Sequence, residues 1–425
     1  MLSKDQIKQI LVSQRETILK KDFGLPRTML SYIGDKKNLP HVIVLTGLRR
    51  SGKSTLLKQI IETYYDNKDF YYITFEDERL FNFQASDFND IYECLIDLYG
   101  PCKTFFIDEI QNIQNFETFV RRFYEQGFKF YITGSSAHLL SRELGTKLTG
   151  RHVDIMLKPF SFFEFLSLKG LQLDKESLYK TENRVHIKQL FEEYVLKGGM
   201  PEYLIHDDLE LLMNIYDDII IKDIAVRYHI DNVATLREVY LYLISNFSKP
   251  FSYNEIKKTL GIGSVNTVIN HISYLEETNF IQTITKFDNS IKKQLINNKK
   301  IYLVDTGFLQ ILSTRLTTDK GWMLENIVFN QLKNQHTDVF YHTNKHDCDF
   351  IVIEKKAVIS VVQVTWELHE NNRDREIKGV YEAMDVFNQD EGMILTFDQE
   401  DIRHRDNKTI YIKPVWKWLL EQHIN

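Results

Sequence analysis

The chain has 425 residues, 43% hydrophobic and 26% charged, which is typical of globular proteins and predicts two or three domains. Its formal net charge of −6 gives no overall attraction to nucleic acid or to an anionic membrane, so DNA contact would need a local basic surface. Three widely spaced cysteines, no apolar leader and no apolar run of roughly 18 residues argue against a disulfide-rich or membrane-spanning protein and predict a soluble, cytoplasmic one.

Residues 1–38 have a mostly helical pattern and precede a region in which strands and helices alternate. Short runs that are apolar throughout, separated by helical stretches, predict a parallel sheet covered on both faces, which is a doubly wound α/β fold. The predicted strands are HVIVLT (41–46), FYYITF (70–75), TFFIDE (104–109), KFYITG (129–134) and HVDIML (152–157). The alternation stops near Lys158, so we assign residues 1–160 to the first domain.

A phosphate-binding loop is predicted directly after the first strand. The segment GLRRSGKST fits the pattern GxxxxGK[ST] and opens the apolar helix STLLKQII. Its glycines let successive backbone N–H groups turn toward phosphates at a helix N-terminus. Lys53 would reach the β- and γ-phosphates of a bound nucleotide, and the Ser54 hydroxyl would ligate Mg²⁺. The predicted nucleotide-binding residues are Gly47, Arg50, Ser51, Gly52, Lys53, Ser54 and Thr55.

Two acidic residues end the strand TFFIDE. Asp108 emerges at the carboxyl end of this strand, which is the edge where ligands bind in open α/β sheets. Together with Ser54 it would hold Mg²⁺, directly or through water. Glu109 follows immediately and would orient and deprotonate an attacking water. A polar exit from a buried strand is the alternative explanation for both residues.

Further catalytic candidates lie after the fourth strand and before the fifth. Thr133 and Ser135 place hydroxyl groups where one could sense the γ-phosphate or the lytic water, although a turn that needs small residues explains them equally. We select Ser135 and, as the arginine that stabilises the transferring phosphoryl group, Arg151. Arg151 would act in its own chain or on a neighbouring copy, which would require an oligomer. Arg49 and Arg50 compete for this role, and a solvated surface charge is the alternative for Arg151.

Residues 161–245 are dominated by helical periodicity, and residues 246–310 have helix-turn-helix spacing followed by a hairpin, which predicts a winged helix. On the second helix the predicted buried stripe is Val265, Val268, Ile269, Ile272, Tyr274 and Leu275, and the predicted outward residues are Asn266, Thr267, Asn270 and His271. The lysines near the hairpin are Lys286, Lys292, Lys293, Lys299 and Lys300. Such residues suit base edges and phosphates of DNA, and a protein-interaction module is the alternative.

Residues 311–425 predict a second α/β domain. Its predicted strands are VFYHT (339–343), DFIVIE (349–354), VISVVQVT (358–365) and GMILTF (392–397).

Six segments, taken in chain order, resemble those of a prokaryotic family of ATP-binding proteins. They are GLRRSGKST, FIDEIQN, ITGSSAHLLS, LTGR, LKPFSFFEF and LKGGMPEY. Members of that family carry an AAA-like module, of the additional-strand, catalytic-glutamate class of P-loop ATPases, followed by a C-terminal domain of unknown function. The resemblance extends over roughly residues 15 to 400. It implies that Lys53, Ser54, Asp108 and Glu109 form the nucleotide site.

The same resemblance implies a restriction-nuclease-like fold of the PD-(D/E)XK kind for the last domain. The matching residues are Glu325, Asp349 and Gln363, with Thr365 where a lysine belongs. A Mg²⁺ nuclease needs converging carboxylates and usually a lysine, and Gln363 and Thr365 supply neither. We therefore expect a degenerate nuclease site that is retained for binding.

These patterns predict a Mg²⁺-dependent ATPase in which nucleotide state moves the helical and C-terminal domains, with DNA or another protein as candidate partners and no membrane. The first alternative is a nucleotide-dependent binding switch with little turnover. P-loop kinase chemistry is disfavoured because no small acceptor site or lid arginines follow the DE strand, and a DNA-processing nuclease is the remaining alternative.

Overall fold

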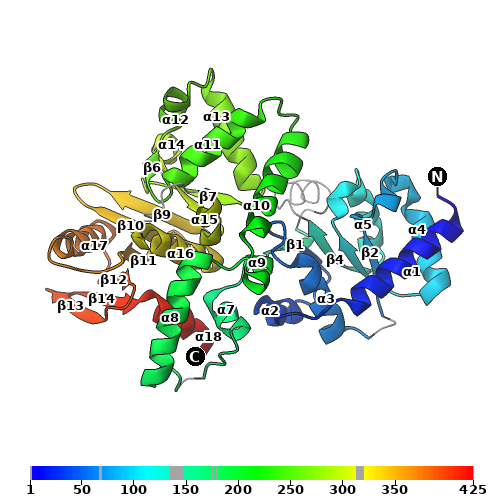
Figure 1. The fold of residues 1–425 in the computed structure, drawn as a ribbon, viewed down its shortest axis with the longest axis horizontal. Helices are drawn as coiled ribbons and strands as arrows, with labels where there is room; N and C mark the ends of the chain where they lie inside the picture. Colours follow the sequence, from blue (N-terminus) through cyan, green and yellow to red (C-terminus); the bar gives the residue numbers. More distant parts are fainter. Residues whose placement is uncertain are drawn as a thin grey trace. The chain divides into compact units, whose positions relative to one another are not determined.

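The computed structural model describes residues 2–66, 69–134, 148, 150–174, 176–178, 180–312 and 320–424. The chain folds into two compact units, one of residues 1–158 with 277–279 and one of residues 159–276 with 280–425. Figure 1 shows the first unit mainly in blue and cyan and the second in green to red. Among the described residues, every helix is too short or too polar to cross a membrane.

The first unit contains a parallel five-stranded sheet in the order β2-β3-β4-β1-β5. The strands are β1 (Val42–Thr46), β2 (Tyr71–Thr74), β3 (Thr104–Asp108), β4 (Lys129–Gly134) and β5 (His152–Met156). All five predicted strands and the α/β fold are confirmed. Because β4 lies between β1 and β3, the sheet has the additional-strand order that the resemblance implied.

Helices cover both faces of this sheet, as the wholly apolar strands require. Ile43 and Leu45 pack into one core with α2 and α3, whereas Val42 and Val44 pack into another core with α4 and α5. The elements are α1 (Lys4–Lys20), α2 (Met29–Asp35), α3 (Lys53–Tyr64), η1 (Glu78–Leu80), η2 (Ala85–Asp87), α4 (Phe88–Tyr99), η3 (Ile110–Asn112) and α5 (Phe116–Glu125).

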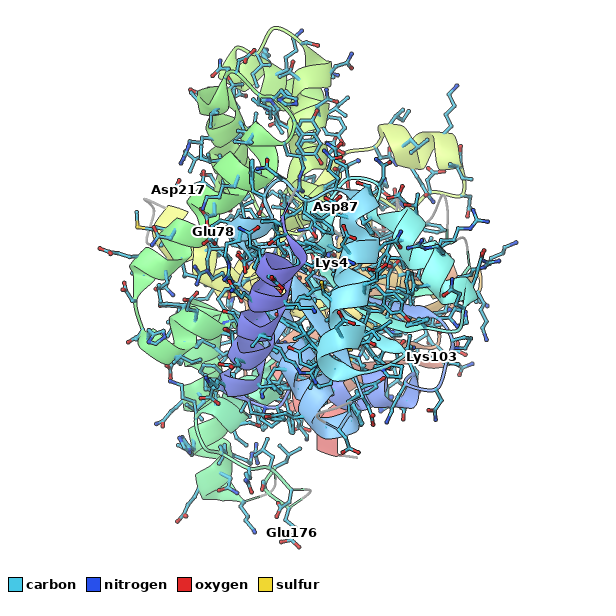
Figure 2. The ribbon with its side chains drawn as sticks, turned by 90° about the vertical axis from the view of Figure 1, so that its right-hand side faces the viewer. Lys4, Glu78, Asp87, Lys103, Glu176 and Asp217 are labelled. Carbon is cyan, nitrogen blue, oxygen red and sulfur yellow. The ribbon has the colours of Figure 1, made fainter. Side chains whose placement is uncertain are left out.

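The predicted helical lead-in is largely one helix, α1, which begins with a reciprocal cap between Ser3 and Gln6. It packs against the edge strand β2 and against α4. Lys4, which lies at its start and is labelled in Figure 2, forms an ion pair with Glu93 of α4. The lead-in therefore belongs to the core of the first unit.

The second unit begins with helices, as predicted. They are α7 (Phe162–Leu168), α8 (Thr181–Lys197), α9 (Pro201–His206), α10 (Leu209–Asp218), the π-helical segment η4 (Ile219–Val226) and α11 (Val233–Ser245). Between α8 and α9 the backbone of Gly199 accepts a hydrogen bond from the Phe160 N–H at 2.7 Å, and a Cβ at Gly199 would lie 2.1 Å from the Phe160 oxygen. The segments LKPFSFFEF and LKGGMPEY, which carry the resemblance, thus pack directly on each other.

Two helices and a small antiparallel sheet follow, which is the set of elements that a winged helix needs; the assignment to that fold stays a prediction. They are β6 (Pro250–Phe251), α12 (Tyr253–Leu260), α13 (Val265–Glu277), β7 (Ile281–Thr285) and β8 (Lys299–Leu303), with the sheet order β6-β8-β7. The connection between β7 and β8 contains an unpredicted helix, α14 (Ile291–Ile296).

The predicted faces of α13 were wrong at two positions. Ile269 is exposed and His271 is buried, the reverse of the prediction. The observed buried set is Val268, His271, Ile272 and Leu275, whose spacing of three, four and seven residues lies on one helix face. Burial lowers the pKa of His271, so the imidazole in this face is neutral near pH 7.

The rest of the second unit is a mixed six-stranded sheet in the order β13-β14-β12-β11-β10-β9. Its strands are β9 (Asp338–Thr343), β10 (Asp347–Glu354), β11 (Ala357–Val364), β12 (Glu391–Thr396), β13 (Asp401–Arg405) and β14 (Lys408–Pro414). The accompanying helices are η5 (Thr306–Phe308), α15 (Leu309–Leu312), α16 (Lys320–Gln335), α17 (Arg373–Phe387) and α18 (Val415–Ile424). The four predicted strands are confirmed, β13 and β14 were not predicted, and the nuclease-like assignment stays a prediction.

Candidate nucleotide-binding site

The loop between β1 and α3 has the backbone shape that its glycines permit. Gly47 has φ 147° and Gly52 has φ 97°, values that residues with a Cβ rarely adopt. A Cβ on Gly47 would also lie 2.2 Å from the Leu157 oxygen. Arg50 has φ 63° and is exposed, and the Ser51 N–H donates to the Leu48 oxygen at 3.1 Å. The loop therefore turns sharply just before the helix begins.

Lys53 lies over this loop with its ammonium group held by backbone oxygens. Its Nζ donates to the oxygens of Leu48 and Gly47, at 3.1 and 3.3 Å, and lies 3.9 Å from Oε1 of Glu109. The Ser51 hydroxyl is buried and has no hydrogen-bond partner among the described residues. A buried cation and an unsatisfied hydroxyl at a helix N-terminus fit a phosphate group. Ser54 and Thr55 follow in the first turn of α3.

Thr133 of β4 connects Asp108, the last residue of β3, with Glu109, which follows the strand. Its hydroxyl donates to Oδ1 of Asp108 and accepts a hydrogen bond from the Glu109 N–H at 3.0 Å. Asp108 and Thr133 are both buried, and Glu109 has φ 51°. The Gln111 side chain donates to the Glu109 carboxylate. Asp108 and Glu109 are thus fixed side by side next to Lys53.

A cavity of about 300 Å³ adjoins the loop on the side of Asp108. Ser54 and Asp108 both line it, so a hydroxyl and a carboxylate oxygen face one space, which is the ligand chemistry that Mg²⁺ prefers. Gln14 and Thr17 of α1 and Tyr72 of β2 form other walls, and the sequence analysis did not find them. Burial, and then the charge of Asp108, raises the pKa of the Tyr72 hydroxyl, which is therefore neutral at this wall.

Arg27 supports the loop from behind and was also missed. Its guanidinium donates to the Ser51 oxygen at 2.9 Å and to the Lys158 oxygen at 2.7 Å. Gln59 of α3 accepts a hydrogen bond from the Arg27 N–H and donates two, to the backbone oxygens of Phe23 and Leu25. The segment before β1 therefore packs against the loop, although it contains no pattern that would have indicated this role.

The remaining catalytic candidates are not assembled at this site. Arg151 directly precedes β5, and its oxygen accepts a hydrogen bond from Val42 at the start of β1. It therefore lies at the amino edge of the parallel sheet, whereas the loop follows the carboxyl end of β1. Its exposed side chain pairs with Glu125 at 3.3 Å. Within one chain Arg151 does not reach the loop, so only contact with a neighbouring copy would give it a catalytic role. Ser135 lies outside the described residues.

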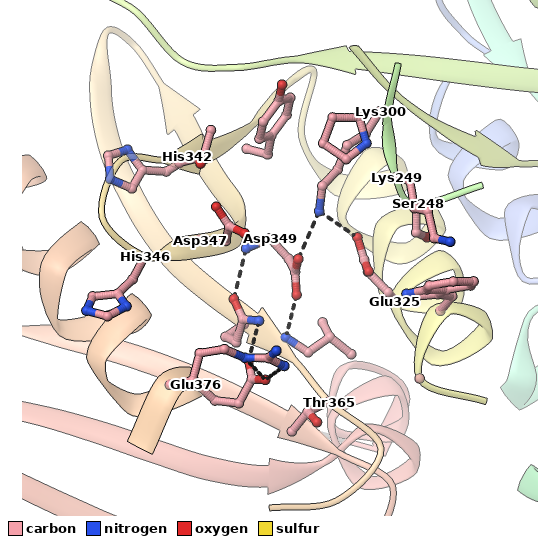
Figure 3. Close-up of a pocket in the computed structure, with 18 of the residues that line it drawn as sticks. Ser248, Lys249, Lys300, Glu325, His342, His346, Asp347, Asp349, Thr365 and Glu376 are labelled. Carbon is pink, nitrogen blue, oxygen red and sulfur yellow. Dashed lines mark hydrogen bonds and ion pairs between the residues drawn. The ribbon is translucent and has the colours of Figure 1, made fainter. Parts of the chain in front are cut away.

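Two of the residues predicted for a degenerate nuclease site, Glu325 and Asp349, lie together in the second unit. Both bond to the side chain of Lys300 (Figure 3). Lys300 Nζ lies 3.1 Å from Oε1 of Glu325 and 2.9 Å from Oδ1 of Asp349. All three residues are buried. Lys300 was predicted to face DNA phosphates, and its burial in this ion pair shows that this prediction was wrong.

The side-chain amide of Gln363 lies beside these charges and bonds to the Asp349 backbone and to Glu376. Its oxygen accepts from the Asp349 N–H at 3.0 Å, and its nitrogen donates to Glu376 at 2.7 Å. Burial and the charge of Asp349 raise the pKa of Glu325, and Lys300 opposes this shift. Burial lowers the pKa of Lys300, but the two carboxylates outweigh it and the net pKa is raised. Among the described residues, no group of three or more His, Cys, Asp or Glu side chains is arranged to hold a metal ion.

The hydrogen bonds of Thr133 yield a stability prediction. Thr133→Val keeps the shape of the side chain but leaves the buried Asp108 carboxylate without this donor, so we expect the first unit to lose about 1–3 kcal/mol of unfolding free energy. Thr133→Ser keeps the hydroxyl and should lose only about 0.8 kcal/mol for the missing methyl group. Urea unfolding of both variants measures the difference, and equal stability of Thr133→Val and wild type would contradict the proposed hydrogen bonds.

Comparison with known proteins agrees with this geometry. Residues 39–166 match the family described as an AAA domain, and residues 188–319 match a domain of unknown function, DUF8612. Among solved structures, AMPPCP-bound DnaA of Aquifex aeolicus has 17% identity and a TM-score of 0.25 over 58% of this chain and 86% of that one. A RuvB mutant of Thermotoga maritima has 14% identity and a TM-score of 0.27 over 66% of this chain and 90% of that one. The sheet order and the AAA match, rather than these two structures, establish the fold.

Two relatives that are at least 30% identical match most of the chain. The uncharacterized protein MJ1544 of Methanocaldococcus jannaschii is 33% identical over 90% of this chain and 89% of its own length. An uncharacterized protein of Haemophilus influenzae is 30% identical over 80% of this chain and 86% of its own length. The chain therefore belongs to the family of these uncharacterized proteins and carries an AAA-type P-loop domain near its N-terminus.

Proposed function

We propose that this protein is a Mg²⁺-dependent ATPase. The observation that carries the proposal is the placement of Lys53, Asp108 and Glu109 together at one edge of the sheet, with Thr133 bonded to both acidic residues. The AAA match supports ATP as the nucleotide. Gly47, Arg50, Ser51, Gly52 and Thr55 would complete the loop around the phosphates.

The P-loop geometry supports phosphate binding in a specific way. The Lys53 ammonium is already desolvated and held by two backbone oxygens, so a triphosphate would replace weak neutral acceptors with charged ones. The buried Ser51 hydroxyl would gain an acceptor. Ser54 and Asp108 would hold Mg²⁺, which when bound supplies charge neutralisation for the phosphate oxygens.

Glu109 is proposed as the general base for the attacking water. Its positive φ and the hydrogen bond from its N–H to Thr133 fix the start of the side chain, and Gln111 holds one carboxylate oxygen. A carboxylate in this position would take a proton from water as the water oxygen bonds to the γ-phosphorus and the bond to ADP breaks. Arg151 of a neighbouring copy remains our candidate for stabilising the transferring group.

The division of the chain into two compact units supports coupling of nucleotide state to movement of the second unit. The alternative is a switch in which nucleotide binding, with little turnover, changes that unit. The role of Glu109 distinguishes the two, because only an ATPase needs a general base.

Duplex DNA is the partner that four exposed polar residues of α13 and α14 support. The exposed apolar side chains of α14, Ile291, Leu295 and Ile296, support the alternative, a protein partner. Asn266 and Asn270 are exposed on α13, and Lys292 and Lys293 are exposed on α14. Amides of this kind can bond base edges, and lysines bind phosphates. The proposal needs these residues and excludes Lys300, which is buried.

Single-turnover hydrolysis of Mg·ATP tests the catalytic proposal. Glu109→Gln should lower the rate roughly 10²- to 10⁴-fold, the contribution of a general base, while ATP binding remains. Glu78→Gln, at an exposed position in the same unit, is the matched control and should retain the wild-type rate. Equal rates for Glu109→Gln and wild type would remove Glu109 from catalysis and favour the switch.

Duplex binding measured at several salt concentrations tests the DNA proposal. The double variant Lys292→Gln, Lys293→Gln should weaken binding and lower the slope of log affinity against log salt by about 1–2. The double variant Lys355→Gln, Lys356→Gln removes two exposed charges from the β10–β11 turn and should leave the slope unchanged. Wild-type affinity that does not depend on salt would rule out this partner.

A further inference from the structure

A lysine lies where the nuclease resemblance would place a metal ion. Glu325 and Asp349 match the carboxylate positions of that fold, and each directs an oxygen at Lys300 Nζ, within 3.1 Å and 2.9 Å (Figure 3). A divalent cation that binds between two carboxylates needs the same two oxygens. The ammonium group and a metal ion therefore compete for one position.

Tyr302, Val364 and Gln363 also bond to the groups around this position. Tyr302 donates its hydroxyl to Oε1 of Glu325 at 2.7 Å, and the Val364 N–H donates to Oδ2 of Asp349 at 3.1 Å. Gln363 contributes a neutral amide that is bonded to Asp349 and Glu376. Three of the four carboxylate oxygens, Oε1 of Glu325 and both oxygens of Asp349, thus have protein partners, and such pairing lowers the cost of burying charge.

The backbone that carries Lys300 is fixed on both sides. Lys300 lies in β8, the central strand of the three-stranded sheet, opposite Pro250 of β6 and Ile284 of β7. The end of β7 is tied to the six-stranded sheet, because the Phe287 N–H donates to the Tyr341 oxygen at 2.8 Å. The lysine therefore comes from one sheet and its two carboxylates belong to the neighbouring α16 and β10.

We propose that Lys300 is a built-in replacement for the divalent cation of a nuclease-like site. The pocket around it has a volume of about 500 Å³, enough for a small ligand, and includes Lys249, Trp322 and Arg375. With Lys300 in place no divalent cation binds between the two carboxylates, and phosphodiester cleavage that depends on Mg²⁺ or Mn²⁺ does not occur there. The inference concerns the second unit and is independent of the proposed ATPase function.

Removing the ammonium group should open the position to a metal. Lys300→Met keeps the length of the side chain and leaves two buried carboxylates without a cation, so the variant should unfold at a lower temperature. Without nucleotide, the Tm of this variant should rise as the Mn²⁺ concentration is increased, because the ion binds the folded state. Electron paramagnetic resonance should detect the bound ion. Wild type and the neighbouring control Lys299→Met should show neither effect. Adding Asp349→Asn to Lys300→Met should abolish both.

Two outcomes would overturn the proposal. One is a folded Lys300→Met protein that binds no more Mn²⁺ than wild type. The other outcome needs no Lys300 variant. It is Mn²⁺ binding or plasmid nicking by wild type that Asp349→Asn removes, because this would mean that a metal reaches the site despite the lysine. Equal plasmid nicking by wild type and Asp349→Asn is the expected result.

Discussion

The hydroxyl of Thr133 holds Asp108 and Glu109, the two acidic residues on which the proposed ATPase chemistry depends. It can do so because β4 lies between β1 and β3, which brings a β4 side chain next to the end of β3. The same hydroxyl accepts the N–H of Glu109, whose backbone has a positive φ and needs such support. Since parallel strands end at one edge, this arrangement also places the acidic pair beside the loop that follows β1, and Lys53 spans the short distance between them.

Buried charged groups in the second unit also have hydrogen-bonding or ion-pair partners, as Lys300, Glu325 and Asp349 do. Asp305 accepts hydrogen bonds from the N–H groups of Gly199 and Gly307, so the turn between α8 and α9 is bound to the start of η5. Burial raises the pKa of Asp305 to about 6, and these two donors limit the increase. Lys300 joins two sheets in the same way. Contacts of this kind hold distant segments of the second unit together.

Local patterns were sufficient for the strands of the first unit and for the phosphate loop, because wholly apolar runs and GxxxxGKS have few other structural explanations. Arg151 shows what such patterns omit. The site residues follow their strands, whereas Arg151 precedes β5, so the direction of a parallel sheet already places it at the opposite edge. Chain order alone contained that signal, and the resemblance of LTGR to a family motif obscured it.

Other features could not be predicted because they depend on contacts between distant segments. The interaction of Lys300 with Glu325 and Asp349 crosses 25 and 49 positions of sequence, and KKIYL alone favours an exposed lysine. Arg27 has no motif and is defined only by the loop that it supports. Strand β13 lies at the edge of its sheet and is rich in charged residues, whereas β14 alternates buried and half-buried residues. Neither therefore has the pattern of a wholly buried strand.

In the proposed function, the loop after β1 binds the phosphates of ATP through Lys53. Calorimetric titration of Mg·ATP into wild type and Lys53→Ala tests it most directly. Loss of a charge-assisted hydrogen bond should weaken binding by roughly 10- to 100-fold. Equal affinity of the two proteins would contradict the account.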